Sequence, residues 1–167
     1  TATMEAVREH FGGDDSSPQV ALVIMQARDR QVLAAVAGTS FARSQYNPAV
    51  QARRQAGSTF KPSVSAAGLA AGVLTHETTY PNKRIRYAGK TSGWSPRNSD
   101  GVHDGSATSI SDALRRSLNV IAVQALRDTG IPQFTDFCRR VGISAPIPAD
   151  LTAALGSAEV SPLELTR

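Results

Sequence analysis

Two short apolar runs near the start of the chain constrain the first part of its fold. Residues 19–25 and residues 32–36 each have the length of a strand, and the polar turn at 28–30 lies between them. Apolar runs of this length around a tight polar turn are typical of an antiparallel hairpin. We therefore expect residues 19–36 to form two paired strands, closed by Gly38.

Most of the remaining chain has the pattern of short helices. Glycine fits the expected helix ends because it adopts positive φ without steric cost, and serine fits the expected starts. A hairpin followed mostly by helices is typical of the α+β class, with part of an antiparallel sheet at one edge of a helical region. The expected helices are 2–11, 59–71, 109–116, 119–128 and 131–141, with Gly12, Gly72 and Gly130 as stops and Ser109 or Ser111 as a cap.

Two segments lack such a pattern. Residues 39–57 are polar and loop-like, and residues 75–107 are interrupted by proline and glycine throughout. A loop as long as the second is usually functional or is packed against another part of the protein. We expect a long irregular excursion there.

Composition and charge exclude several classes of function. The 167 residues fit one domain or a large piece of one. The net charge of +4 comes without a polybasic run, and five Phe, three Tyr and one Trp give little stacking surface, so we expect no nucleic-acid partner. The single Cys138 excludes a disulfide framework and is expected to be a buried structural thiol. The three histidines lie far apart in the sequence, so we expect no metal site and no cofactor.

Neither end of the chain has the pattern expected of a natural terminus. It starts with Thr1 and carries no signal peptide and no apolar run of membrane-spanning length. Residues 161–167 have the pattern of a helix start without room for the helix. We therefore expect the chain to be an excerpt of a larger protein.

Ser58 and Lys61 carry the first candidate for chemistry. Positions i and i+3 share one face of a helix, so the amine can reach the hydroxyl. The start of a helix offers free N–H groups and a positive dipole end, which favour a developing oxyanion. A serine needs a base to take its proton, and a desolvated lysine with a lowered pKa can be that base. Gly57 would let the backbone come close to the reacting group. On these residues alone, a serine helix cap beside a solvated lysine is the alternative.

Ser117 and Asn119 form the second candidate, between two expected helices. A hydroxyl and an amide two residues apart can point into one cleft from a turn. The hydroxyl could relay a proton, and the amide could hold a substrate amide. The alternative is a turn that simply caps the following helix.

Taken together, these motifs and their flanks resemble the transpeptidase domain of penicillin-binding proteins, most closely the bifunctional class A enzymes. A Ser-x-x-Lys motif with a second Ser/Asn motif is typical of that superfamily. The resemblance covers nearly the whole chain, and several ordered motifs are more specific than any one. The similar segments are 44–53, 54–62, 94–98, 100–101, 111–120 and 154–165, in the family's order.

The resemblance implies a penicillin-binding protein/β-lactamase-like transpeptidase fold and a role for each matching residue. Ser58 would attack the carbonyl between two terminal D-alanines of a peptidoglycan stem peptide, and Lys61 would accept its proton. Ser117 would pass a proton toward the leaving D-alanine, and Asn119 and Gly57 would bind the substrate. An amine of a neighbouring stem would then form the cross-link, whereas a β-lactam would acylate Ser58 and stay.

The resemblance also implies a setting. The parent protein would be membrane-anchored, would carry a glycosyltransferase domain, and would act outside the cytoplasm, in the periplasm or on the outer face of the cytoplasmic membrane.

One motif of the family is missing. Its third motif, Lys-Thr-Gly on an inner strand, does not occur, and residues 90–93 are not that motif because Gly does not directly follow Thr. The missing strand would pair with the hairpin and supply a second oxyanion donor. We therefore expect residues 1–167 to be a partial transpeptidase domain without its C-terminal strands, inactive alone. A second chain carrying the C-terminal half is one way to complete it.

Two other functions remain open at this point. A β-lactam-hydrolysing or β-lactam-sensing relative would share the Ser-Thr-Phe-Lys tetrad, because class D hydrolases also carry it. Residues 54–57 and 94–98 favour the transpeptidase instead. A degenerate domain that binds wall peptide without catalysis is the third interpretation.

Overall fold

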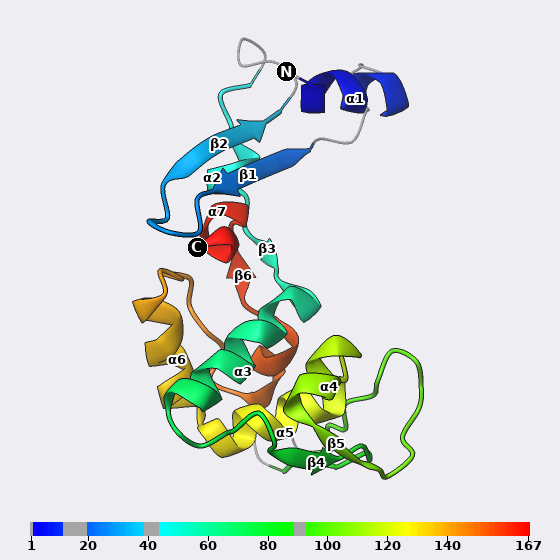
Figure 1. The fold of residues 1–167 in the computed structure, drawn as a ribbon. Helices are drawn as coiled ribbons and strands as arrows, with labels where there is room; N and C mark the ends of the chain where they lie inside the picture. The colour runs from blue at the N-terminus through cyan, green and yellow to red at the C-terminus, as the bar shows by residue number, and fades with distance from the viewer. Residues whose placement is uncertain (1, 12–19, 39–43, 89–92) are drawn as a thin grey trace. The chain divides into compact units, whose positions relative to one another are not determined.

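The computed structural model describes residues 2–11, 20–38, 44–88 and 93–167 (Figure 1). The chain divides into two compact units, residues 1–54 with 160–167 and residues 55–159. It passes from one unit to the other through β3 (Arg54–Gln55) and back through β6 (Glu159–Val160). The expected helix stop at Gly12 and the first residue of the expected hairpin, Gln19, lie outside the described residues.

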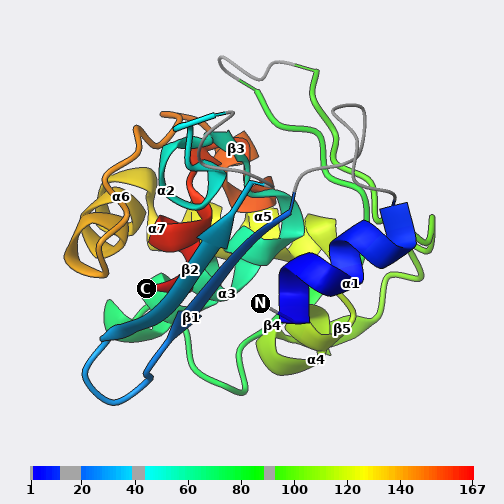
Figure 2. The same cartoon turned by 90° about the horizontal axis from the view of Figure 1, so that it is seen from above.

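The first unit contains the expected hairpin. β1 (Ala21–Met25) and β2 (Val32–Ala37) pair in antiparallel fashion, with Ala21 opposite Ala37. The turn between them includes Arg30 at a φ of 60°, and Figure 2 shows the two strands running side by side. The alternation of apolar runs and a polar turn was therefore sufficient to locate this element.

Two further helices of this unit lie on either side of the hairpin in the sequence. α1 (Ala2–Phe11) has the expected bounds. α2 (Pro48–Gln51) lies in the segment that we expected to be a loop. Its first turn forms because the Asn47 side chain accepts a hydrogen bond of 3.0 Å from the Ala49 N–H, and because proline is preorganised for the first helical position.

The end of the chain corrects a second expectation. Residues 161–167 were expected to lack room for a helix, yet α7 (Pro162–Thr166) forms one short turn there. Ser161 and Glu164 make a reciprocal capping box, in which each side chain accepts a hydrogen bond from the other's backbone N–H. Arg53 forms an ion pair with the buried Glu164. These contacts stabilise a helix that is too short to be stable through its own backbone hydrogen bonds.

The second unit is mainly helical, with its core around α5 (Asn119–Thr129). α5 packs against α3 (Lys61–Ala70), α6 (Ile131–Arg140) and the 3₁₀ helix η2 (Leu151–Leu155). Its side chains Val120, Ile121, Val123, Ala125 and Leu126 are each 1% exposed or less. The predicted helices are thus present, with the expected glycine stops at Gly72 and Gly130, both at positive φ.

Aromatic and thiol groups complete this core. The rings of Phe60 and Phe134 meet edge to face, with centroids 5.6 Å apart, a favoured arrangement for aromatic pairs. Cys138 is fully buried, and burial raises the pKa of its thiol to about 12. The interpretation of Cys138 as a buried structural thiol is confirmed.

The excursion expected to be irregular has more structure than its composition indicates. Its two ends pair as β4 (Thr79–Pro81) and β5 (Ala107–Ser109), antiparallel. β5 leads directly into α4 (Ile110–Arg115), which is capped by the side chain of Ser109. The two ends of this segment are therefore held together by backbone hydrogen bonds.

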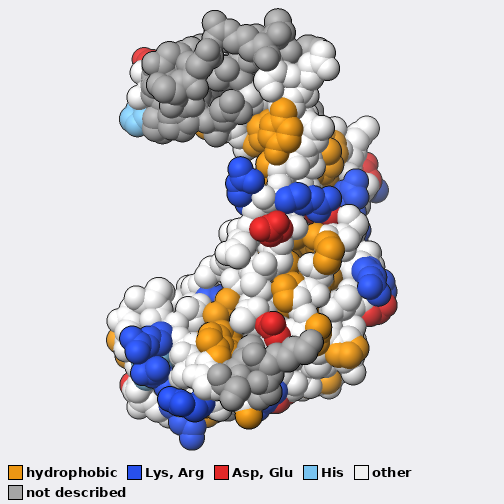
Figure 3. Space-filling model, turned by 180° about the vertical axis from the view of Figure 1, so that it is seen from behind, with side chains coloured by type: hydrophobic (Ala, Val, Ile, Leu, Met, Phe, Trp, Pro, Cys, Tyr) orange, Lys and Arg blue, Asp and Glu red, His pale blue; other side chains and the backbone are white. Residues whose placement is uncertain are grey.

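The surface that Figure 3 shows carries Lys and Arg side chains in several separate groups, interspersed with acidic and hydrophobic ones. Among the described residues, no helix is long and apolar enough to cross a membrane. In the same residues, no group of three or more His, Cys, Asp and Glu side chains is placed to hold a metal ion.

Candidate active site

Lys61 joins the two motifs that the sequence analysis singles out. It begins α3, and its side chain is only 3% exposed. Its Nζ donates hydrogen bonds to the Ser117 carbonyl (2.6 Å), to Ser117 Oγ (2.9 Å) and to Asn119 Oδ1 (2.6 Å). The structure therefore places Lys61, Ser117 and Asn119 in one site, although 56 residues separate the first two.

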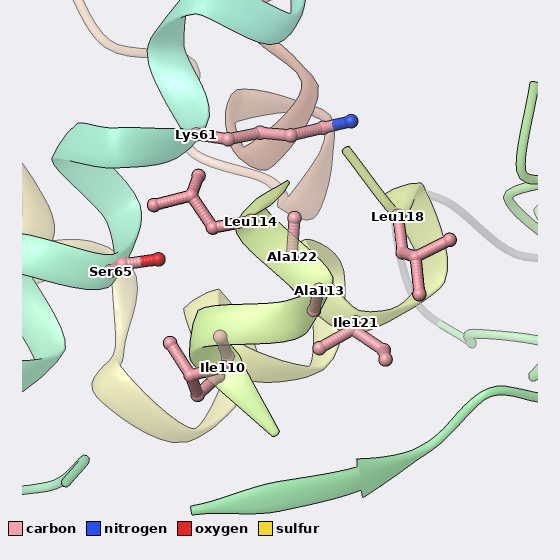
Figure 4. Close-up of a pocket in the computed structure, with 9 residues that line it drawn as sticks. Lys61, Ser65, Ile110, Ala113, Leu114, Leu118, Ile121 and Ala122 are labelled. Carbon is pink, nitrogen blue, oxygen red and sulfur yellow. The ribbon is translucent and has the colours of Figure 1, made fainter. Parts of the chain in front are cut away.

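Burial changes the acid–base behaviour of Lys61. Its aliphatic stem lies above a small apolar pocket (Figure 4), and removal from water disfavours the charged amine. This burial lowers the pKa of Lys61 from 10.5 to about 8. At pH 7, roughly a tenth of the lysine is then neutral and able to accept a proton. The pocket is lined by Lys61, Ser65, Ile110, Ala113, Leu114, Leu118, Ile121, Ala122 and Ala125.

Ser58 lies just before Lys61. It belongs to the 3₁₀ helix η1 (Gly57–Phe60), and its carbonyl accepts a hydrogen bond from the backbone N–H of Lys61. Its side chain is exposed. Within the described residues, no hydrogen bond joins the side chains of Ser58 and Lys61, because the lysine donates to Ser117 and Asn119 instead. The sequence predicted a helix over 59–71, whereas the 3₁₀ helix η1 extends to Phe60 and α3 begins at Lys61.

The backbone of Ser117 has an unusual conformation. Its φ of 56° is left-handed, which costs a residue with a side chain roughly 1–3 kcal/mol. This conformation ends α4, because the Ser117 N–H donates to the Leu114 carbonyl and the Leu118 N–H donates to the Ala113 carbonyl. That pair of bonds is the Schellman motif, in which this position is usually glycine. The turn directs both the carbonyl and Oγ of Ser117 toward Lys61.

Asn119 is the first residue of α5. Its Oδ1 accepts from Lys61, and its Nδ2 donates a hydrogen bond of 2.7 Å to the carbonyl of Arg97. The side-chain amide is therefore held at both ends, by Lys61 on one side and by the 97–104 segment on the other. The sequence analysis did not predict this second contact.

Gly57 makes a close contact, although with a different partner than expected. Its φ is 58°, and its N–H donates to the Gly156 carbonyl at 3.0 Å. A Cβ on Gly156 would lie 2.1 Å from the Gly57 carbonyl oxygen, so no other residue fits at position 156 without backbone movement. The contact that needs glycine is thus between two backbone segments. The expected substrate-binding role of Gly57 stays a prediction.

Comparison with known proteins identifies the class to which this fold and site belong. Residues 20–161 match the family model described as penicillin binding protein transpeptidase domain. Penicillin-binding protein 1A of Neisseria meningitidis serogroup A is 40% identical over 151 residues, which cover 88% of this chain and 19% of that protein. The chain therefore belongs to the penicillin-binding protein transpeptidase family, as its motifs indicate.

Solved structures agree with this assignment. The crystal structure of penicillin-binding protein 1A from Haemophilus influenzae superposes with a TM-score of 0.78 at 32% identity, covering 86% of this chain and 22% of that one. Penicillin-binding protein A from Mycobacterium tuberculosis, solved as an imipenem acyl-enzyme complex, superposes with a TM-score of 0.65 at 26% identity, covering 72% of this chain and 32% of that one. The predicted α+β penicillin-binding protein transpeptidase fold is confirmed.

Proposed function

We propose that this chain carries the nucleophile and the general base of a serine-type D-Ala-D-Ala transpeptidase. The observation that supports this most is the contact of Lys61 with both Ser117 and Asn119. It unites the Ser-x-x-Lys and Ser-x-Asn motifs around an amine whose pKa is lowered to about 8. Such an amine can accept a proton near neutral pH, as nucleophilic serine catalysis requires.

We propose an acylation step in which these residues act in turn. Neutral Lys61 takes the proton of Ser58 Oγ while that oxygen bonds to the carbonyl carbon of the penultimate D-alanine. The tetrahedral intermediate then collapses, and the bond to the terminal D-alanine nitrogen breaks. The proton passes from Lys61 through the Ser117 hydroxyl, 2.9 Å away, to that nitrogen, and D-alanine leaves. An ester on Ser58 remains.

The second half of the reaction reverses these roles. The amine of a neighbouring stem peptide attacks the ester, its proton returns through Ser117 and Lys61 to Ser58 Oγ, and the cross-link forms. A β-lactam enters by the same acylation step, but its opened ring keeps the leaving nitrogen attached and blocks the acceptor. Asn119 is proposed to hydrogen-bond the substrate through its amide.

The remainder of the parent protein is part of the proposal. The chain spans about a fifth of the length of the curated relatives it matches. We propose that a further segment, on the same or a second chain, supplies a Lys-Thr-Gly strand, and that residues 1–167 alone are inactive. We also propose a membrane anchor, a glycosyltransferase domain and an extracytoplasmic location for that parent.

Adduct mapping tests the function directly. After incubation of the full-length protein with a penicillin, we expect digestion and mass spectrometry to find one penicilloyl group, on Ser58, that persists for many minutes. Slow release fits a transpeptidase, because its site is arranged for an amine acceptor rather than for water. Release within seconds would instead support the β-lactam-hydrolysing alternative, and no adduct at all would support a degenerate, non-enzymatic domain.

The lowered pKa of Lys61 gives a second test. Because the reactive form is the neutral amine, the rate constant for penicillin acylation is expected to rise about tenfold per pH unit below 8 and to level off above it. The measurement is the rate of labelling by a fluorescent penicillin from pH 6 to pH 9, with thermal unfolding followed over the same range as the control. A flat or falling profile would exclude Lys61 as the base.

A further inference from the structure

The N-terminus of α5 is capped from outside the helix. Its N-cap residue, Leu118, provides no side-chain hydrogen bond to the first turn. The acceptor comes from Asn98, whose Oδ1 receives the Val120 N–H at 3.2 Å. Val120 directly follows Asn119, so the cap acts on the turn that carries the proposed substrate-binding amide. First-turn N–H groups have no partner within a helix.

Asn98 is itself fixed in position. It is 4% exposed, and its Nδ2 donates to Asn82 Oδ1 at 2.7 Å and to the Val102 carbonyl at 2.8 Å. The backbone carbonyl of Asn98 accepts a hydrogen bond from the Gly101 N–H at 3.1 Å. All the hydrogen-bonding groups of the side chain are thus used, which leaves a buried amide one orientation.

His103 completes the set of contacts around Asn98. The backbone N–H of Asn98 donates to His103 Nε2 at 3.2 Å. In the tautomer that accepts at Nε2, the Nδ1 N–H can donate to the Gly101 carbonyl, 2.9 Å away. The imidazole thereby closes the 98–103 turn and leaves no backbone donor of Asn98 without an acceptor.

One peptide group connects the hydrogen bonds around Asn98 to Asn119 and Lys61. The carbonyl of Arg97, which belongs to the same peptide group as the Asn98 N–H, accepts from Asn119 Nδ2 at 2.7 Å. Asn119 Oδ1 in turn accepts from Lys61. The N–H of this peptide group donates to His103, and its carbonyl accepts from Asn119. A rotation of the plane would therefore displace the amide of Asn119.

We propose that Asn98, with His103 behind it, is the positioning residue that fixes Asn119 for acylation. It does so by capping α5 at Val120 and by holding the Arg97 carbonyl against the Asn119 amide. Asn98 does not reach the substrate in this role and acts only through Asn119. The inference rests on the proposed acylation of Ser58.

The test compares Asn98→Ala with Asn82→Ala in the full-length protein. Asn82 is equally buried, at 0% exposed, and belongs to the same network through Asn98 and Asp104, but it does not contact α5 at Val120. We expect N98A to lower the limiting acylation rate at saturating penicillin on the order of 10²-fold, because small misplacements of catalytic groups cost about this much. The apparent dissociation constant should change little. N82A should lose comparable thermal stability with a much smaller loss of rate.

Hydrogen exchange supplies a readout that does not depend on acylation. In N98A, exchange of the amide hydrogens in the peptide spanning 118–121 should speed up at least several-fold, since the Val120 N–H loses its acceptor. N82A should leave it unchanged. If the wild-type protein is not acylated at all, the proposed function fails, and exchange alone then decides whether Asn98 caps α5.

His103→Ala covers the case in which N98A does not fold. It removes the acceptor of the Asn98 N–H from a half-buried position and should lower the limiting rate about fivefold, the effect of one ordinary hydrogen bond. The inference is overturned if H103A acylates at the wild-type rate. It is also overturned if N98A and N82A lose rate in proportion to lost stability, or if exchange at 118–121 is unaltered in N98A.

Discussion

Replacing Ser58 with alanine is expected to abolish labelling of the full-length protein by a fluorescent penicillin. The label is held by an ester to the serine oxygen, so a side chain without that oxygen cannot form it. No partial activity is expected, because removal of a serine nucleophile costs on the order of 10⁶-fold in related chemistry. The measurement is in-gel fluorescence after denaturation, together with the thermal unfolding midpoint of the variant.

Ser63→Ala is a matched control. It also removes a serine hydroxyl, but from α3, two residues beyond Lys61, and it should leave labelling at the wild-type level. Fluorescence that survives in S58A would identify another nucleophile. Ser117 would then be the first hydroxyl to examine, since its Oγ accepts a hydrogen bond from Lys61.

Substitutions of Lys61 are expected to have the second largest effect. Lys61→Arg keeps a cation with several N–H donors, so contacts with Ser117 and Asn119 can persist, but a guanidinium does not lose its proton at neutral pH. Lys61→Met removes both the charge and the donors. We expect both variants to acylate on the order of 10³-fold more slowly, as is typical for the loss of a general base.

The comparison of the two variants distinguishes a role of Lys61 as the general base from a role in holding Ser117 and Asn119 in place. If Lys61 only held Ser117 and Asn119 in place, K61R would acylate close to the wild-type rate while K61M would not. The acylation rate constant of each variant, taken from the time course of penicillin labelling, distinguishes the two cases. Lys83→Met, at an exposed lysine of the same unit, is the control for loss of a positive charge.

The elements that the sequence predicted are those with local causes. The hairpin follows from two apolar runs and a polar turn. α4 begins directly after Ser109, one of the two expected caps, because a serine side chain can accept a hydrogen bond from the first turn of its own helix. The stops at Gly72 and Gly130 follow from the ability of glycine to adopt positive φ. Each of these depends on residues within one or two turns of each other.

The features that the sequence did not predict depend on distant residues or on an unusual residue in a known motif. The short α7 exists because Ser161 and Glu164 cap each other and Arg53, far away in the sequence, pairs with Glu164. The Schellman turn that orients Ser117 carries serine where a pattern search looks for glycine.

The same holds for the candidate site. The contact of Lys61 with Ser117 and Asn119 was implied by the family resemblance rather than by any local pattern. The i, i+3 spacing favoured a contact between Ser58 and Lys61, but no hydrogen bond joins their side chains in the described residues. Residues 94–98 contributed to the family resemblance, but the hydrogen bonds of Asn98 gave no local pattern. Its partners Asn82 and Val120 lie 16 and 22 residues away, and contacts at such separations leave no periodicity. A cap supplied from another segment can be recognised only once the fold brings the two segments together.

The pairing of the Ser58 segment with the end of the second unit has a consequence for biosynthesis. The Ala56 N–H bonds to the Ala158 carbonyl, and the Gly57 N–H bonds to the Gly156 carbonyl. These bonds cannot form until the ribosome has released a further hundred residues or so, and closing so large a loop is slow. The helices between them can assemble earlier, so the Ser58 segment acquires its final backbone support only after residues 156–158 have been synthesised.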